Sequence, residues 1–341
     1  MKVLFIGGTG TISAAISRRL LEAGHDLTLL NRGARNAGLP QEAKEIRCDI
    51  SNETDAAAKL QGQNFDVAVD FTACRPDHLE RDFRLFRGRV KQFIYLSSAA
   101  VYQKPPADYR YSEGSALSNP YWQYARDKLA GEEFLMRKYR EEAFPVTIVR
   151  PGHTYDERAV PLGVHGKKGS WQVLKRILDG KPVIIHGDGT SLWTLTHASD
   201  FARAFTGLMG NLHALGEAVQ ISGDETLTWN QIYEILARAL GKPLRSVHVS
   251  SAFLAQTGQE YDFLGALIGD KANSLVFDNT KLRRLVPGFN ALVRADQGIP
   301  NTVEYLLAHP ELQTEDPEFD AYCDRIIAVR ERAIAELRPP A

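Results

Sequence analysis

Short apolar runs separated by helix-length segments recur through the first 150 residues. The run Val3–Ile6 leads into a glycine-rich stretch, apolar residues follow at helical spacing from Thr11 to Ala23, and a second apolar run covers Leu27–Leu30. Parallel strands that are buried on both faces show this pattern, and helices connect them. The pattern predicts an α/β fold with a doubly wound parallel Rossmann sheet, its further strands lying at Glu45–Cys48, Val67–Phe71, Phe93–Leu96 and Val146–Val149.

The pattern changes after Pro151. Gly and Pro become frequent between Pro161 and Gly189, and helical segments such as Trp229–Leu240 no longer alternate with strands. We therefore expect a Rossmann domain over residues 1–150, to which elements of 151–205 return, and a smaller mixed α/β lobe with C-terminal helices over residues 151–341. Apolar side chains between the charges of Pro317–Leu337 predict a docked amphipathic helix.

The charge balance favours a small-molecule ligand over a polyanion. Lys and Arg total 41 against 42 Asp and Glu, so no broad positive field would attract nucleic acid or an anionic membrane. Three scattered cysteines indicate neither a disulfide framework nor a structural zinc site. Met1–Ile6 reads as a strand and not as a secretory signal, and no apolar run reaches the roughly 20 residues of a membrane span. We expect a cytoplasmic protein without membrane partners.

The glycine-rich run after the first strand has the features of a phosphate-binding turn. Glycines there allow close approach of a pyrophosphate, and the following helix N-terminus offers unpaired N–H groups. Ser13 stands where a third glycine is usual, which predicts slightly looser packing of helix on sheet. Because a strand precedes the run and a βαβ unit contains it, we predict a dinucleotide site with contacts from Gly7, Thr9, Gly10, Thr11 and Ile12.

The end of the second strand distinguishes between the two nicotinamide dinucleotides. An acidic residue there would bond the adenosine ribose and repel a 2′-phosphate, but this chain has Asn31 and Arg32. Arg32, with Arg35 beyond it, can pair with a phosphate, which favours NADP. Asn31 can still bond an unmodified ribose, so NAD stays open.

Hydroxyl groups and a Tyr–Lys pair point to alcohol or ketone chemistry. The fifth predicted strand ends in Ser97 and Ser98, and Tyr124 and Lys128 share one face of a later helix. An ammonium near a phenol stabilises the phenolate, which can then exchange a proton with a substrate hydroxyl while nicotinamide exchanges hydride with the same carbon. We predict catalytic roles for Ser98, Tyr124 and Lys128.

Histidines 165, 186 and 197 and the adjacent Glu132 and Glu133 lack the spacing of a metal or dyad site, so no metal is expected.

These motifs, together with Arg150-Pro151-Gly152, resemble the extended short-chain dehydrogenase/reductases, specifically the NAD-dependent epimerase/dehydratase group. The resemblance covers most of the chain and selects Ser98 over Ser97. It implies a homodimer through the Tyr124 helix and its neighbour. It also implies adenine contacts from Asp49 and Ile50, phosphate and ribose contacts from Phe71, Thr72 and Ala73, and nicotinamide contacts from Pro151 and His153.

The chain departs from the family pattern at positions that bear on the substrate, and one of them is His153, which stands where an Asn is frequent. Many nucleotide-sugar members carry an Arg where Trp193 stands, and an indole cannot neutralise a diphosphate. The run Asn31–Gly33 resembles the atypical branch of the superfamily, which includes proteins similar to chloroplast RNA-binding members. Tyr102, Tyr155 and Trp193 are further candidates for substrate contact.

The sequence thus predicts an NAD(P)-dependent epimerase, dehydratase or oxidoreductase acting on a secondary alcohol, with a sugar or sugar derivative as the favoured substrate and Tyr124 as general acid/base. One alternative is a ketoreductase or dehydrogenase for a non-sugar small molecule. Another is a weakly catalytic nucleotide-sensing or RNA-binding protein on the same fold.

Overall fold

The computed structural model describes residues 1–33 and 42–339, which form two compact units. The first unit contains Met1–Thr154, Thr194–Asp224 and Val276–Val293, and the second contains Tyr155–Trp193, Glu225–Leu275 and Arg294–Ala341. The chain therefore passes from one unit to the other several times. Within the described residues, no helix has both the length and the apolar character that crossing a membrane requires.

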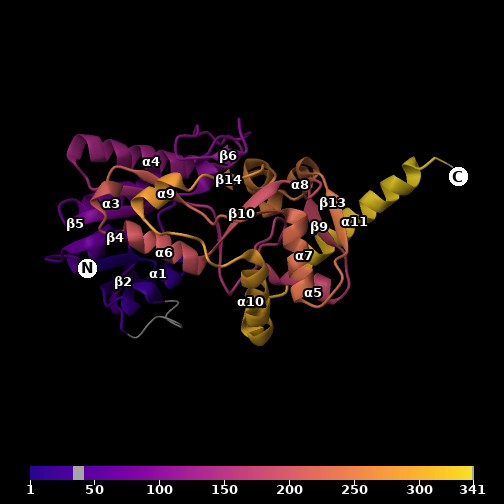
Figure 1. Cartoon of the computed structure of the whole chain (residues 1–341), viewed down its shortest axis with the longest axis horizontal. Coiled ribbons are helices and arrows are strands. Elements are labelled where there is room, and N and C mark those ends of the chain that lie inside the picture. The colour runs from indigo at the N-terminus through magenta and orange to yellow at the C-terminus, as the bar shows by residue number, and fades with distance from the viewer. Residues whose placement is uncertain (34–41, 340–341) are drawn as a thin grey trace. The chain divides into compact units, whose positions relative to one another are not determined.

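A seven-stranded parallel sheet forms the centre of the first unit (Figure 1). Its order is β11-β7-β5-β4-β1-β2-β3. Strands β2 and β3 are added on one side of β1 and the later strands on the other, so the strand order reverses between β1 and β4. The strands are β1 (Lys2–Ile6), β2 (Asp26–Asn31), β3 (Lys44–Arg47), β4 (Phe65–Asp70), β5 (Val90–Leu96), β7 (Val146–Pro151) and β11 (Ala218–Ile221). The predicted doubly wound parallel sheet is confirmed. Sequence analysis missed β11, a four-residue strand in a region without regular strand and helix alternation.

Helices cover both faces of this sheet, which explains the continuous apolar runs of the strands. Side chains alternate along β1: Val3 and Phe5 join one hydrophobic core, and Leu4 and Ile6 join the other. The first core includes residues of α1 (Thr11–Glu22), α6 (Ala198–Leu208) and α9 (Thr280–Leu285). The second includes residues of α2 (Glu53–Lys59), α3 (Pro76–Phe86) and α4 (Gln123–Glu142).

Short elements complete the first unit and connect it to the second. A pair of two-residue strands, β6 (Arg110–Tyr111) and β14 (Val276–Phe277), run parallel. The other elements are η1 (Ala99–Val101), η2 (Leu212–Ala214), β8 (His153–Tyr155) and β10 (Leu192–His197), of which the last two each cross a unit boundary.

The second unit is mainly helical around a small parallel pair of strands, β9 (Val183–His186) and β13 (Ser246–Val249). Helices α7 (Trp229–Ala239) and α10 (Ala295–Ala308) pack together. The remaining elements are α5 (Trp171–Leu178), β12 (Thr226–Thr228), α8 (Ser251–Thr257), η3 (Gln259–Tyr261), the π-helical η4 (Leu264–Lys271), η5 (Pro310–Leu312) and α11 (Pro317–Leu337).

The C-terminal segment forms the predicted amphipathic helix, α11, which docks over only part of its length. Its larger apolar residues from Phe319 to Ile327 are buried, and Asp320 accepts a 2.6 Å bond from the buried Arg176 of α5. Ile334, expected in the docked face, is exposed.

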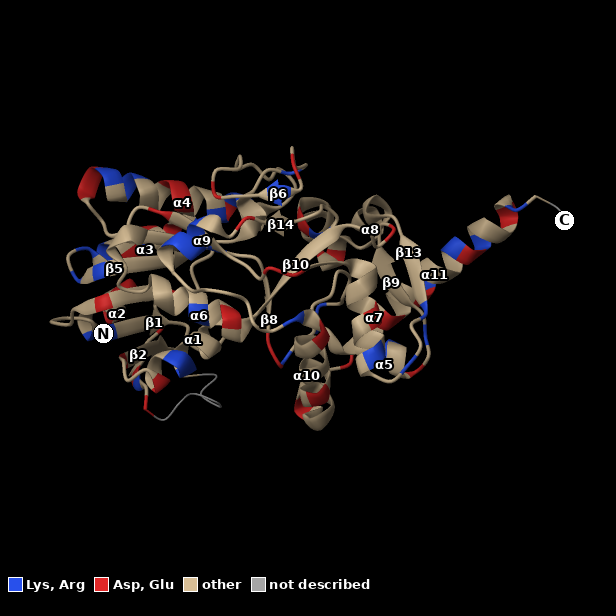
Figure 2. Ribbon diagram, viewed as in Figure 1, with Lys and Arg blue, Asp and Glu red and all other residues tan. Residues whose placement is uncertain are grey.

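Basic and acidic residues are intermixed along α4 and α11 (Figure 2), as the nearly balanced composition suggests.

Candidate functional site

The turn between β1 and α1 has the backbone form that a phosphate-binding site requires. Gly7 has a φ of +79°, a conformation that L side chains rarely adopt, and a Cβ atom there would overlap Cγ2 of Thr72. Gly10 directly precedes α1 and is its N-cap residue. Ser13 is buried, and its Oγ accepts a 2.8 Å bond from the N–H of Gly10, so this N–H is already used. The serine at the third glycine position thus joins the turn to the first residues of α1 by a hydrogen bond.

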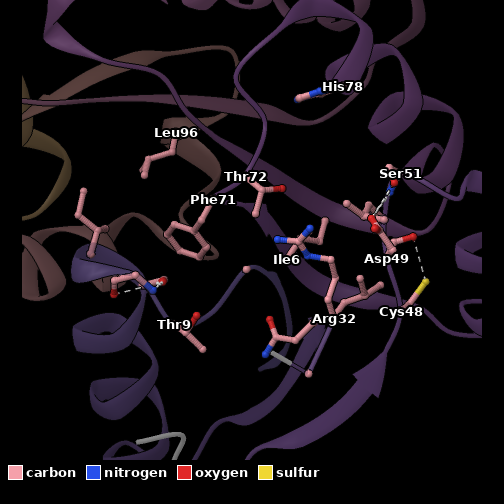
Figure 3. A pocket seen from close by; sticks show the side chains of 18 of the residues that line it. Ile6, Thr9, Arg32, Cys48, Asp49, Ser51, Phe71, Thr72, His78 and Leu96 are labelled. Carbon is pink, nitrogen blue, oxygen red and sulfur yellow. Dashed lines mark hydrogen bonds between the residues drawn. The ribbon is translucent and has the colours of Figure 1, made fainter. Parts of the chain in front are cut away.

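A cavity of about 660 Å³ lies over this turn at the carboxyl ends of β1, β2, β3 and β4. Figure 3 shows Thr9, Phe71, Thr72, Arg32 and Asp49 around it, contributed by separate strand ends. The volume is within the range of about 300–1,000 Å³ that is common for small-molecule sites. Its place at the reversal of strand order is where ligands bind in open α/β sheets.

Most of the predicted cofactor residues line this cavity. They are Gly7, Thr9, Gly10, Thr11, Ile12, Asn31, Arg32, Asp49, Ile50, Phe71 and Thr72. Ala73 is buried beside it, and Pro151 and His153 lie outside its lining, at the end of β7 and the start of β8. Sequence analysis did not select several other lining residues, among them Leu30, Cys48, Ser51, His78, Arg81 and Leu96.

Asn31 has a buried hydrogen-bond donor, Nδ2, for which a bound ligand can supply the acceptor. Its Oδ1 accepts a long, 3.4 Å bond from the N–H of Gly8, whereas Nδ2 is buried with no hydrogen-bond partner among the described residues. A buried amide group without a partner is costly, and a ribose hydroxyl at this strand end would satisfy it. Together with the glycine turn, this orphan donor fits a dinucleotide.

Two guanidinium groups flank the same strand end. Arg32 lines the cavity and is exposed, and Arg47 is the register partner of Asn31 on the neighbouring strand β3. A Cβ at Gly33 would lie 2.8 Å from Nε of Arg47, so the Arg47 guanidinium packs directly on this glycine. Sequence analysis missed Arg47, because only strand register reveals its neighbours. Arg35 lies outside the described residues.

Ser98 lies in the turn after β5, and Tyr124 and Lys128 lie on α4. Lys128 is buried, and its Nζ donates bonds of 2.7 Å to the carbonyl oxygens of Ala73 and Leu96. The same Nζ lies 5.6 Å from the ring centroid of Tyr124, one turn earlier on α4. Burial lowers the pKa of the Lys128 ammonium from its usual 10.5. Ser98 and Tyr124 are both half-buried, so each keeps some accessible surface.

Ser98 caps the helical turn η1 through its side chain. Its Oγ accepts a 3.1 Å bond from the N–H of Ala100, which leaves the hydroxyl proton available to donate. The neighbouring Ser97 points elsewhere: its Oγ donates to the buried Glu132, which also pairs with Arg150 at 2.6 Å. The structure therefore gives Ser97 a place in a buried network, while Ser98 stays accessible.

The three candidate substrate residues are all buried in the protein. Tyr102 is fully buried, its hydroxyl donates to Gln220 at 2.8 Å, and Arg150 lies 5.1 Å from its ring centroid. In the second unit, Tyr155 is buried and Trp193 packs against Trp229 with 5.3 Å between ring centroids. Substrate contact by these three residues stays a prediction.

Comparison with known proteins identifies the family. Residues 3–222 match the model of the NAD dependent epimerase/dehydratase family. The chain belongs to this family. Its members include enzymes that use NAD to epimerise, dehydrate or reduce their substrates, so this protein is an oxidoreductase-type enzyme.

Individual relatives are distant. The chain is 28% identical over 290 residues to 2′-dehydrokanamycin reductase of Streptomyces kanamyceticus, covering 85% of this chain and 80% of that protein. It is also 28% identical over 255 residues to the chloroplast stem-loop binding protein of 41 kDa b of Arabidopsis thaliana, covering 71% and 64%. The structure of UDP-glucuronic acid 4-epimerase from Bacillus cereus with UDP-glucuronic acid and NAD has a TM-score of 0.72, at 20% identity and with 90% and 99% coverage. At this identity the last likeness establishes the shared fold.

Proposed function

We propose that this enzyme interconverts a secondary alcohol and a ketone on a sugar or sugar derivative, with Tyr124 as general acid/base. The observation that carries the proposal is the placement of Lys128. Its ammonium is held by the carbonyl oxygens of Ala73, beside the cofactor cavity, and Leu96, at the end of the strand that precedes Ser98. The Tyr124 ring lies above this ammonium at 5.6 Å.

Each of the three residues has a distinct task. Lys128 stabilises the phenolate of Tyr124 by its charge, and its low exposure strengthens that effect because little water screens it. Tyr124 takes the proton from a substrate hydroxyl, or returns it to a ketone. Ser98, whose own proton is available, donates to the substrate oxygen and holds it near the phenol. Nicotinamide, when bound, supplies or accepts the hydride.

The cofactor site supports NADP as the preferred dinucleotide. Arg32 and Arg47 are exposed next to Asn31, and no carboxylate lies within 4 Å of either guanidinium among the described residues. Two such groups can pair with a 2′-phosphate, and the Nδ2 of Asn31 can donate to the ribose. These features favour net reduction of a ketone with exchange of NADPH, which is also the type of reaction in the name of the Streptomyces kanamyceticus relative.

A Tyr124→Phe variant tests the assignment of the base. We expect turnover to fall by about 10²- to 10⁴-fold, because the variant loses general acid/base catalysis and keeps the ring. Cofactor affinity should stay within twofold of wild type. Tyr139→Phe removes a hydroxyl from the distant end of the same helix and should leave turnover unchanged. Turnover of Tyr124→Phe within a few-fold of wild type would contradict the proposal.

Reduction and epimerisation differ in their cofactor balance. A ketoreductase changes the nicotinamide absorbance in proportion to the substrate consumed, whereas an epimerase shows no net change. No turnover on any alcohol or ketone, together with salt-dependent RNA binding, would instead favour the RNA-binding alternative.

A further inference from the structure

A buried charged cluster adjoins the cofactor cavity. Arg81 of α3 donates through Nη2 to Asp70 Oδ2 at 2.9 Å, and through Nε and Nη2 to Asp82 Oδ1 at 2.9 Å and 2.7 Å. Arg81 is 7% exposed, and both carboxyl groups are completely buried. Burying three ionisable groups is costly, so their arrangement beside a binding cavity calls for a functional explanation.

The surroundings of one of the two carboxyl groups favour its neutral form. Burial, and then the negative charge of Asp70, raise the pKa of Asp82 well above its usual 3.8. Its Oδ2 is buried with no hydrogen-bond partner among the described residues. Asp70 is already committed, because its Oδ1 accepts from Thr72 and Ala73.

The Arg81 guanidinium keeps one nitrogen unused. Nε and Nη2 are bonded to the two carboxyl groups, whereas Nη1 donates to no acceptor in the described part of the chain. Arg81 lines the cavity together with Asp49, Thr72 and His78. A guanidinium held on one edge by carboxyl groups has its other edge fixed in place for a ligand.

The packing of α3 places Arg81 near the part of the cavity that Asp49 and Ser51 line, which the family resemblance assigns to adenosine. Arg84, one turn later, donates to Glu53 at 2.8 Å and so joins α3 to the start of α2. Glu53 follows closely on Asp49 and Ser51, which line the cavity after β3. Hydrogen bonds from Ser51 lower the pKa of Asp49, and the charges of Arg32 and Arg81 add to this effect. Leu96, on the opposite side of β4 and β1, marks the other end of the cavity.

We propose that Arg81 is a cofactor-binding residue whose Nη1 donates to the adenosine of the dinucleotide, with Asp70 and Asp82 holding its guanidinium in position. This proposal rests on the dinucleotide site described above, but not on the role of Tyr124. Nη1 of Arg81 can donate a hydrogen bond, and the carboxylate of Asp49 can accept one. The two side chains would therefore bind an acceptor and a donor of the same nucleoside.

Equilibrium binding of two probes tests the proposal without any turnover. ADP contains the adenosine and both phosphates, and inorganic pyrophosphate contains only the phosphates. Arg81→Met should weaken ADP binding by about tenfold, as loss of one hydrogen bond from a charged donor would, and leave pyrophosphate binding unchanged. Arg87→Met makes the same substitution next to the end of α3, at an exposed residue paired with Glu142, and should bind both probes as wild type does.

Arg81→Lys provides a second variant if Arg81→Met does not fold. It keeps a positive charge between the carboxyl groups but lacks the second edge of the guanidinium, so ADP affinity should again fall about tenfold. ADP affinity within twofold of wild type in either folded variant would overturn the proposal. Equal weakening of ADP and pyrophosphate would overturn the adenosine assignment and move the contact to the phosphates. Because no reaction is measured, failure here is separate from failure of Tyr124→Phe.

Discussion

The ammonium group of Lys128 donates a 2.7 Å hydrogen bond to the carbonyl oxygen of Ala73, which lies 55 residues earlier in the chain. The N–H of Ala73 in turn donates to Asp70 at 3.0 Å, so one peptide segment contacts both the proposed catalytic lysine and the buried carboxyl cluster. Through this segment the position of α4 is tied to the end of β4. The cofactor cavity and the Tyr124 face of α4 are therefore linked by hydrogen bonds through this segment.

Replacement of Lys128 by Met should change the pH dependence of the reaction. Without the ammonium the Tyr124 phenolate is less stable, so the acid limb of kcat/KM against pH should move to higher pH, and turnover at neutral pH should fall by about 10- to 100-fold. Lys138→Met alters the same helix at a residue paired with Glu142 and should leave the profile in place. A profile for Lys128→Met that coincides with that of wild type would disprove the electrostatic role.

Removal of either guanidinium near Asn31 should alter the choice of dinucleotide. We expect Arg32→Ala and Arg47→Ala each to weaken NADPH binding by about tenfold relative to NADH, because each removes a charged donor to the 2′-phosphate. Titration of both dinucleotides against each variant gives the ratio directly. Arg18→Ala, an exposed position on α1, is the matched control. An unchanged NADPH to NADH ratio in both variants would leave the NADP preference without a structural basis.

These residues also show how far the sequence alone could predict the site. The glycine turn and Asn31–Arg32 were predicted because local order along the chain determines them: a strand, a turn and a helix N-terminus follow one another directly. Arg47 and Arg81 were missed because their neighbours are distant in sequence. Arg47 meets Asn31 only through the register of β2 and β3, and Arg81 reaches the cavity only because α3 packs against the sheet and α2.

The adjacent glutamates of α4 illustrate the same limit. Glu132 is buried against Arg150 while Glu133 is exposed, because adjacent residues of a helix point in different directions. Helical geometry did not predict that Glu132 would also accept from Ser97. Tyr102 sits in the same buried network, which neither its position after β5 nor its residue type could reveal.

The buried carboxyl of Asp82 predicts a specific pH dependence of stability. Its pKa is raised in the folded state, so the folded protein binds this proton more tightly than the unfolded chain does. The stability it contributes is fully present below the unfolded value of 3.8, and it is lost as pH rises through the folded pKa. Asp82→Asn, which imitates the neutral acid, should avoid this loss and exceed wild type in free energy of unfolding by about 1–2 kcal/mol at pH 7.

Asp77, an exposed residue on the same helix, supplies a control of opposite sign. Its hydrogen bond from Arg75 lowers the pKa of Asp77 to about 2, so its contribution is present above 3.8 and lost as pH falls. Asp77→Asn should therefore lose stability at neutral pH. Urea denaturation of both variants between pH 4 and 8 gives the comparison. A difference between Asp82→Asn and wild type that does not grow with pH would show that Asp82 is ionised in the folded protein.

Gly131 sets how closely α4 can approach the sheet, and hence where Lys128 lies. A Cβ at this position would lie 2.5 Å from Cδ1 of the buried Leu79 and 3.0 Å from the hydroxyl of Tyr95. Ala ordinarily stabilises a helix by about 1 kcal/mol relative to Gly, but here the overpacking should dominate and reduce the free energy of unfolding by about 1–3 kcal/mol. Because Leu79 is buried, we expect α4 to shift outward, so the bonds from Lys128 to Ala73 and Leu96 should weaken and turnover should fall with stability.

A double-mutant cycle with Leu79→Ala separates this steric effect from a general loss of helix packing. Leu79→Ala alone removes buried methyl groups and should cost about 2–5 kcal/mol. It also removes the atom nearest to the added Cβ, so the double variant should be more stable than the sum of the single changes predicts, by about 1 kcal/mol or more. Additive effects in urea denaturation would mean that Leu79 does not limit the approach of α4, and that Gly131 does not fix the position of Lys128 through this contact.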